Sequence, residues 1–311
     1  MSANVPLVVR LLASSVSVAG RAGKIVRDVM SKGELGIVEK AKDDYQTEAD
    51  RSAQKCIIAS LSAQFPKVNI IGEEEQCQSS EEELTDSIIL EADKEILRLD
   101  CPASLKSVKE EDIVVWVDPL DGTSEYTQGF LEHVTVLIGI SVNEQPVAGV
   151  IHQPYYRSLV AGEKILGRTI WGLQEVGVGG FTPAPPPDSL VITTTRSHSN
   201  PVVEKALQVM NASQILRVGG AGYKVLQLLE GAASVYVFAS AGCKKWDTCA
   251  PEAVLRAAGG RLTDILGNCY KYGPEVSHPN ATGVLAAATA DLHAFALSKI
   301  PQELKDKLAC K

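Results

Sequence analysis

The fold of this chain is decided by the stretch Val-Val-Trp-Val-Asp-Pro-Leu-Asp-Gly-Thr at residues 114–123. Its four apolar, β-prone residues predict a buried strand that ends at Asp118. Pro119 lacks a backbone donor and turns the chain, and Gly122 permits a backbone conformation that other residues resist. We expect a helix to start after Asp121, with amides that can hold an anion. The two carboxylates suit hard cations, but these residues are also common in a plain strand-ending turn.

Composition and charge limit the classes of protein to which the chain can belong. Its 311 residues, 45% hydrophobic and 22% charged, are enough for one large or two ordinary domains, each with its own core. A formal net charge of −8 argues against a general nucleic-acid-binding surface, which would be basic. No apolar run is long enough to span a membrane, and the seven irregularly spaced cysteines indicate reduced thiols. We therefore expect a monomeric cytoplasmic protein that binds neither nucleic acid nor membrane.

Two helices are predicted before the central stretch. An apolar stripe of helical spacing predicts the first over residues 7–30, capped by Gly33. Thr47 is typical of an N-cap, and the helix that follows it would pack one face on the core until Pro66. Asp50 lies in the first turn of this second helix, where a carboxylate commonly does no more than interact with the helix dipole.

A further acidic group follows residues 68–72, which read Val-Asn-Ile-Ile-Gly and predict another strand. Glu73 is the first of three adjacent glutamates there. Adjacent acids usually form a solvated surface, but the end of a buried strand is also where functional groups are found. Residues 76–112 are acidic and irregular; we expect one helix near residues 91–99 and assign the segment no function.

The rest of the chain divides at a proline-rich stretch, residues 182–188. Before it, residues 134–142 and 147–152 predict an antiparallel pair of strands. After it, strands alternate with helices, which predicts a largely parallel sheet. We therefore expect an α+β domain over residues 1–184, followed by an α/β domain over residues 185–311.

Two predicted helix starts in the second half carry residues suited to binding. The glycine run at residues 219–222 precedes a helix with Lys224 in its first turn, which suits a phosphate cradle or a tight strand-to-helix turn. Asp247 opens a later helix, directly after Trp246, which we interpret as a core residue.

Five carboxylates are thus expected at the ends of strands or the starts of helices: Asp50, Glu73, Asp118, Asp121 and Asp247. Magnesium prefers oxygen ligands in octahedral geometry and keeps water and substrate phosphate in its shell. Two like charges about 4 Å apart repel by roughly 4 kcal/mol at an effective dielectric near 20. Convergence of these acids therefore implies bound metal, raised pKa values or a wrong fold.

With metal bound, such a site is suited to hydrolysis at phosphorus. One ion lowers the pKa of a water and a second stabilises the leaving oxygen. The hydroxyl of Thr123 could orient that water, and Asp50 could bias the position of the hydroxyl proton of Thr123. The amides that follow Asp121 could receive phosphate oxygens.

Three motifs together resemble a known superfamily: Glu73-Glu74, residues 118–123, and Trp-Asp-Thr-Cys-Ala at residues 246–250. In this order they resemble the signature of the magnesium-dependent, lithium-sensitive phosphatases, which include inositol monophosphatase and fructose-1,6-bisphosphatase. The resemblance implies a layered αβαβα sandwich of the sugar-phosphatase type, with the site at the domain junction. It also implies two or three magnesium ions and inhibition by lithium.

Within that superfamily, residues 193–198, 218–224 and 242–247 are most similar to the family of 3′(2′),5′-bisphosphate nucleotidases, which act in nucleotide metabolism and sulfate assimilation. That family hydrolyses the 3′(2′)-phosphate of adenosine 3′(2′),5′-bisphosphate to AMP. Related substrates include 3′-phosphoadenylyl sulfate and inositol 1,4-bisphosphate. By this resemblance Asp50 and Thr123 are the water-activating pair. The implied magnesium ligands are Glu73, Asp118, the carbonyl of Leu120, Asp121 and Asp247. The implied substrate-binding residues are Gly122, Thr123, Thr195, His198, Gly220 and Lys224.

Three other readings compete with this one. Aspartyl-phosphate phosphatases use an Asp-x-Asp motif, but Asp118 and Asp121 are one residue further apart and Pro119 changes the path between them. A non-catalytic nucleotide sensor would be expected to lack some of the acids that bind metal, and none of the motif acids is substituted here. An inositol phosphatase of the same superfamily is the third alternative. Only the size of the pocket between Thr195 and Lys224 would distinguish it from a bisphosphate nucleotidase.

Overall fold

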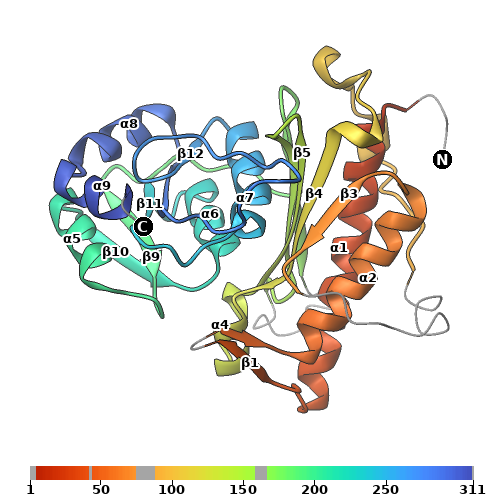
Figure 1. Ribbon diagram of the computed structural model, residues 1–311, viewed down its shortest axis with the longest axis horizontal. Helices are drawn as coiled ribbons and strands as arrows, with labels where there is room; N and C mark the ends of the chain where they lie inside the picture. The colour runs from red at the N-terminus through yellow and green to blue at the C-terminus, as the bar shows by residue number, and fades with distance from the viewer. Residues whose placement is uncertain (1–4, 42–43, 75–87, 158–166, 310–311) are drawn as a thin grey trace.

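The protein is a stack of five layers in which helices and sheets alternate (Figure 1). The structure, a computed structural model, describes residues 5–41, 44–74, 88–157 and 167–309. Helices α1 (Leu7–Lys32) and α2 (Glu48–Gln64) cover one face of a six-stranded sheet, and helices of the second half lie on its other face. The predicted αβαβα sandwich is therefore confirmed.

The six-stranded sheet has the order β3-β4-β5-β6-β7-β8. Its strands are β3 (Asn69–Gly72), β4 (Ile113–Asp121), β5 (Thr135–Val142), β6 (Gln145–Gln153), β7 (Arg168–Leu173) and β8 (Gly177–Gly179). The first pair is parallel and all the others are antiparallel, including the predicted pair β5 and β6. Both faces of β4 are buried, because it lies between α2 and α7 (Lys245–Ala257).

Strand β4 runs further than the sequence indicates. It continues through Pro119 and Leu120 to Asp121 instead of ending at Asp118. The register with β5 shifts between Asp118 and Asp121, which is the kind of irregularity where a strand tolerates proline. Helix α4 (Thr123–Gln128) follows after Gly122, whose φ of 93° lies in the left-handed region that glycine favours.

The second sheet is mixed, whereas the sequence predicts a largely parallel one. Its order is β10-β9-β11-β13-β12. The strands are β9 (Val191–Thr195), β10 (Gln214–Val218), β11 (Val235–Phe238), β12 (Arg261–Thr263) and β13 (Val284–Ala287). The first three are parallel, but β13 is antiparallel to both its neighbours. The chain returns from β12 to β13 without a crossover helix, and a parallel pair would need one.

Helices flank this second sheet on both sides. They are α5 (Pro201–Met210), α6 (Ala221–Leu229), α7, α8 (Ala290–Lys299) and α9 (Gln302–Ala309). Helices α6 and α7 lie between the two sheets (Figure 1). Helix α7 packs directly on the first sheet at Gly139, Gly149 and Gly172, where an added Cβ would lie 2.6, 2.5 and 2.7 Å from helix atoms. This close packing brings the start of α7 to the end of β4.

The segment before β4 contains less helix than expected. In place of a helix over residues 91–99, the structure has one 3₁₀ turn, Ile96–Arg98. The carboxylate of Asp93 accepts the amides of Glu95 and Ile96, and such a local side-chain turn competes with a longer helix.

The expected division at residue 184 falls between β8 and β9. One apolar cluster joins residues of both halves, since Trp116 and Leu137 pack with residues from 191 onwards. Two separate domains therefore stay a prediction. Within the described residues, no helix is both long and apolar enough to cross a membrane, and every described cysteine is a free thiol.

Candidate active site

Three of the five predicted carboxylates converge at the junction of the two sheets. Asp118 and Asp121 come from the end of β4 and Asp247 from the first turn of α7. One oxygen of each lies within 4.8 Å of the other two. Asp118 and Asp121 are buried, and Asp247 is half-buried. Buried carboxylate oxygens gathered in this way form a donor set that fits magnesium.

Crowding and burial change the acidity of these groups. Burial raises the pKa of Asp118 well above its usual value, and the charges of Glu73 and Asp121 add to this effect. Burial, with the charges of Glu73 and Asp121, raises the pKa of Asp247 to about 8. Without cations the cluster therefore tends to hold protons, and bound cations would favour the charged carboxylates instead.

Asp121 is held by the start of α6. The amide of Ala221 donates to its Oδ1 and the amide of Gly222 to its Oδ2, both at 2.8 Å. Thr135 donates to Oδ2 at 2.6 Å. The interpretation of the glycine run as a phosphate cradle is therefore wrong for these two amides, because a carboxylate of the protein already occupies them. The alternative, a tight strand-to-helix turn, describes the run better.

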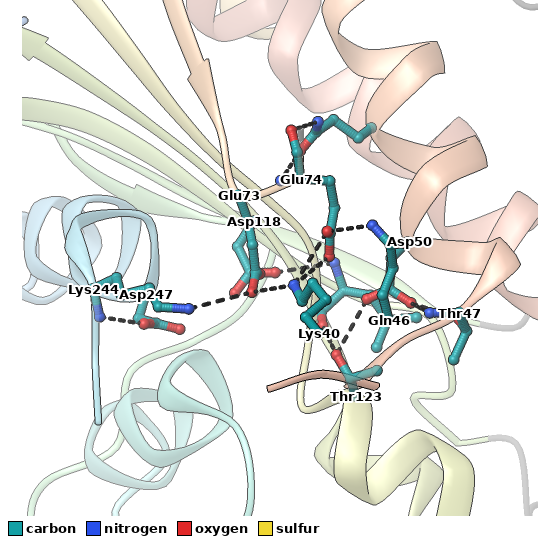
Figure 2. A network of polar contacts seen from close by, with 12 residues as sticks. Lys40, Gln46, Thr47, Asp50, Glu73, Glu74, Asp118, Thr123, Lys244 and Asp247 are labelled. Carbon is teal, nitrogen blue, oxygen red and sulfur yellow. Dashed lines mark hydrogen bonds and ion pairs between the residues drawn. The ribbon is translucent and has the colours of Figure 1, made fainter. Parts of the chain in front are cut away.

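Glu73 lies at the end of β3, beside the cluster (Figure 2). Its Oε1 is 3.4 Å from Nζ of Lys40 and 4.0 Å from Nζ of Lys244. Its charge raises the pKa of both Asp118 and Asp247, so it lies within electrostatic reach of the three aspartates. The predicted Glu73 is thus brought to the site with two ammonium groups beside it.

Glu74 has a structural role that the sequence does not reveal. It is buried, and its carboxylate accepts Lys40 at 2.9 Å and also Gln46, both from the hairpin of β1 (Val38–Ala41) and β2 (Asp44–Gln46) (Figure 2). The side-chain amide of Gln54 donates to the carbonyl of Glu74 and accepts from its amide. These bonds fix the backbone directly after Glu73.

Asp50 and Thr123 are 73 positions apart in the sequence but are in contact in the structure. Thr47 and Asp50 form a capping box at the start of α2, in which the amide of Thr47 donates to Oδ2 of Asp50 at 2.7 Å. The other oxygen, Oδ1, lies 3.1 Å from the hydroxyl of Thr123, which is also 3.1 Å from the carbonyl of Leu120. A hydroxyl has one proton, so it donates to one of these acceptors at a time. Burial raises the pKa of Asp50 to about 7, which suits proton exchange near neutral pH.

A cavity of about 500 Å³ opens beside these groups. Its lining includes every residue predicted to bind substrate: Gly122, Thr123, Thr195, His198, Gly220 and Lys224. Lys224 is buried, and its ammonium donates to the carbonyl of Gly220 at 2.9 Å. The hydroxyl of Thr195 accepts the amide of His198 at 3.0 Å. The substrate-binding roles of these residues stay predictions.

Several lining residues carry no signal in the sequence, among them Tyr45 in β2 and Tyr236 and Phe238 in β11. These strands carry no motif, so only the tertiary arrangement brings the three residues to the cavity. Trp246 is a core residue as expected: it is 6% exposed and lies 6.4 Å from Trp116, centroid to centroid.

Comparison with known proteins decides the family. Residues 8–305 match the model of the inositol monophosphatase family. The chain belongs to the inositol monophosphatase family. Among curated proteins it is 50% identical to human 3′(2′),5′-bisphosphate nucleotidase 1, with 99% of each chain covered. It is 39% identical to the Dictyostelium discoideum protein of the same name, over 86% of this chain and 89% of the other.

Solved structures of the inositol monophosphatase type share the fold. A structure of inositol monophosphate-bound SaIMPase-II superposes with a TM-score of 0.66 at 16% identity, covering 94% of this chain and 95% of the other. Identity this low supports the fold alone. The family assignment rests on the sequence match, and the αβαβα arrangement of this member agrees with it.

Proposed function

We propose that this member of the family hydrolyses the 3′(2′)-phosphate of adenosine 3′(2′),5′-bisphosphate to AMP and phosphate in a magnesium-dependent reaction. The observation that carries the proposal is the convergence of Asp118, Asp121 and Asp247 within 4.8 Å, beside a cavity large enough for a nucleotide. The 50% identity to human 3′(2′),5′-bisphosphate nucleotidase 1 supports this substrate class.

The magnesium ions would be held by acids from three elements. Asp118, Asp121 and Asp247 are the proposed ligands of two or three magnesium ions, joined by Glu73 and the carbonyl of Leu120. Magnesium bound there would supply an activated water and stabilise negative charge on the phosphate. The hydroxyl of Thr123 would orient the attacking water, and Asp50 would accept a proton through it.

The cavity would hold the rest of the substrate. Lys224, Gly220 and Gly122 line the part next to Asp121, where a positive charge and backbone groups suit phosphate oxygens. Thr195 and His198 also line the cavity. Tyr236 and Phe238 line it too, but they are 1% and 4% exposed and so offer little surface to a base. The 50% identity to human 3′(2′),5′-bisphosphate nucleotidase 1 favours a nucleotide over an inositol phosphate, and 3′-phosphoadenylyl sulfate and inositol 1,4-bisphosphate are further candidate substrates.

Two rival functions are less well supported. A nucleotide sensor without catalysis would not need the full set of converging acids. An aspartyl-phosphate mechanism would need the Asp-x-Asp spacing, whereas Asp118 and Asp121 are one residue further apart. We further propose inhibition by lithium and a role in sulfate assimilation, both by similarity to the family. We also propose that the protein is a cytoplasmic monomer.

The proposal is tested by measuring phosphate release from a panel of nucleotide and inositol bisphosphates, with magnesium and with a chelator. We expect the fastest release from adenosine 3′,5′-bisphosphate, and none with chelator. Faster release from inositol 1,4-bisphosphate would favour the inositol phosphatase. Nucleotide binding without phosphate release would favour the sensor, and a trapped phospho-aspartate would favour the aspartyl-phosphate mechanism.

A further inference from the structure

We propose that His133 is a positioning residue of the metal site: it accepts the amide of Gly219 and so fixes the turn whose next amides orient Asp121. The inference rests on the proposed role of Asp121 as a magnesium ligand. His133 lies in the 3₁₀ turn Leu131–His133, just before β5, and it is remote in sequence from the turn that it contacts.

His133 is held in one orientation by its neighbours. Only 7% of it is exposed, and its ring lies 4.8 Å from the ring of Tyr223 and 6.0 Å from that of Phe130. Its Nδ1 lies 3.2 Å from the amide nitrogen of Gly219. A backbone amide can only donate, so Nδ1 must be without a proton and the neutral ring carries its proton on Nε2. Burial lowers the pKa of His133, which favours this neutral form.

The turn that His133 contacts has almost no space around it. A Cβ on Gly219 would lie 2.0 Å from the carboxyl carbon of Glu125. A Cβ on Gly220, whose φ is +66°, would lie 2.6 Å from the carbonyl oxygen of His133 and 2.9 Å from Oδ2 of Asp121. Glycine therefore permits the close approach, but glycine also leaves the backbone free to rotate. The hydrogen bond to His133 holds the N–H of the first peptide of the turn, and the carbonyl of that peptide, from Val218, accepts the amide of Arg196 at 3.1 Å.

The restraint is transmitted to Asp121 over two residues. After Gly219 and Gly220, the amides of Ala221 and Gly222 each donate to a different oxygen of Asp121. A rotation of the turn would move both donors together, because they follow one another in the backbone. If the acceptor on His133 is removed, the buried amide of Gly219 loses its hydrogen-bond partner. Because a buried amide without an acceptor is unfavourable, the turn would then rotate to expose this amide to water. Asp121 would then lose the fixed orientation that metal ligands obtain from the groups around them.

Three variants of the full-length protein separate this role from simple packing. His133→Leu keeps the bulk but removes the acceptor, whereas His133→Asn places an oxygen or nitrogen near the former Nδ1. His293→Leu is the matched control, since His293 is also buried but contacts Thr263, away from the cavity. Two quantities are measured for each: the magnesium concentration at half-maximal phosphate release, and the rise in Tm on adding magnesium without substrate.

We expect His133→Leu to need roughly tenfold more magnesium and to show a smaller rise in Tm, as is usual when a group supporting a metal ligand is removed. His133→Asn should restore both values to within about threefold of wild type. His293→Leu should lower Tm while leaving the magnesium requirement unchanged. Wild-type magnesium dependence in His133→Leu, or equal impairment in His133→Asn, would overturn the inference.

Two further observations keep the test decisive. If His133→Leu does not fold, the ¹⁵N shifts of the His133 ring in the wild-type protein still report whether Nδ1 is without a proton, and a protonated Nδ1 would overturn the inference. If the wild-type protein releases no phosphate from bisphosphates, the proposed function fails. The Tm response to magnesium, which needs no substrate, then still tests the role of His133.

Discussion

The hydroxyl of Thr123 lies 3.1 Å from Oδ1 of Asp50, although the two residues are 73 positions apart. Asp50 caps helix α2 with its other oxygen, so one carboxylate serves both the helix and the site. Thr123 begins α4, directly after the strand that carries Asp118 and Asp121. The contact therefore joins the start of one helix to the strand that carries the proposed metal ligands. We expect mutations of the metal ligands to affect magnesium binding and mutations of Thr123 to affect the chemical step.

Asp118→Asn should abolish nearly all phosphatase activity and leave the fold intact. The side chain is 1% exposed and isosteric with asparagine, so the substitution removes charge but not volume. We expect phosphate release to fall by about a hundredfold or more, while Tm without magnesium is unchanged or higher because a crowded carboxylate is removed. Turnover close to wild type would reject Asp118 as a ligand.

Thr123→Ala should slow the chemical step and leave magnesium binding intact. Its hydroxyl contacts Asp50 and the carbonyl of Leu120, and its loss removes the proposed proton path. We expect kcat to fall by roughly 10²- to 10⁴-fold at unchanged magnesium affinity, measured by titration of activity with the metal. If magnesium affinity falls by the same factor as kcat, Thr123 has a structural role instead.

Lys224→Ala should weaken bisphosphate substrates more than simple monophosphates. The ammonium lies in the cavity wall and is held by the carbonyl of Gly220, so it can contact a second phosphate. We expect KM for the bisphosphate to rise about tenfold or more, which corresponds to a loss of about 1.4 kcal/mol. KM for a nucleoside monophosphate serves as the comparison, and equal losses on both substrates would remove Lys224 from the binding site.

Gly20→Ala and Gly23→Ala should have opposite effects on stability, although both lie in α1. Nothing lies within 4 Å of a Cβ on Gly20, so alanine there should stabilise the helix by about 0.5–1 kcal/mol. A Cβ on Gly23 would lie 2.1 Å from Nε2 of His152, so alanine should destabilise the protein by about 1–3 kcal/mol. Urea unfolding of both variants measures the difference; equal free energies of unfolding would show that α1 can move away from β6.

His152 should make the protein less stable in acid. Burial lowers its pKa to about 3, so below its ordinary value of 6.5 the unfolded chain takes up a proton that the folded chain does not. The contribution of His152 to the free energy of unfolding is therefore fully present above pH 6.5. It is lost as the pH falls towards 3, by up to about 1.4 kcal/mol per pH unit.

The effect is isolated by comparing wild type with His152→Gln. Buried acids such as Glu252, whose pKa burial raises to about 7, act in the opposite direction in both proteins and cancel in the difference. The difference in the free energy of unfolding between pH 5.5 and 7.5 should be larger for wild type. A pH dependence that is unchanged in His152→Gln would show that His152 takes up its proton equally in the folded and the unfolded protein.

Much of the fold follows from local patterns. Thr47 caps α2 and Gly33 ends α1, with φ of 77°, as their residue types predict. The apolar run before Asp118 is a buried strand, and the alternation of strands and helices marks the second half. The extension of β4 beyond Pro119 could not be predicted, because it depends on the irregular pairing with β5.

The sequence predicts the acids of the candidate site, but it does not predict the residues that hold these acids in place. The three aspartates meet, and the six residues expected to bind substrate line one cavity. Gln54 and His133 belong to no motif, and their partners lie 20 and 86 positions away. Periodicity carries no information about such pairings.

By itself, the sequence predicted most of the elements, several of their caps, the family and the acids at the ends of the elements. Only the tertiary structure decided which groups the glycine turn serves: the amides of Ala221 and Gly222 bind Asp121, a hundred positions earlier in the chain, and not a phosphate. The reason is physical. A local pattern fixes which backbone amides a helix start leaves without a partner, but which acceptor reaches them depends on how two sheets distant in sequence pack together.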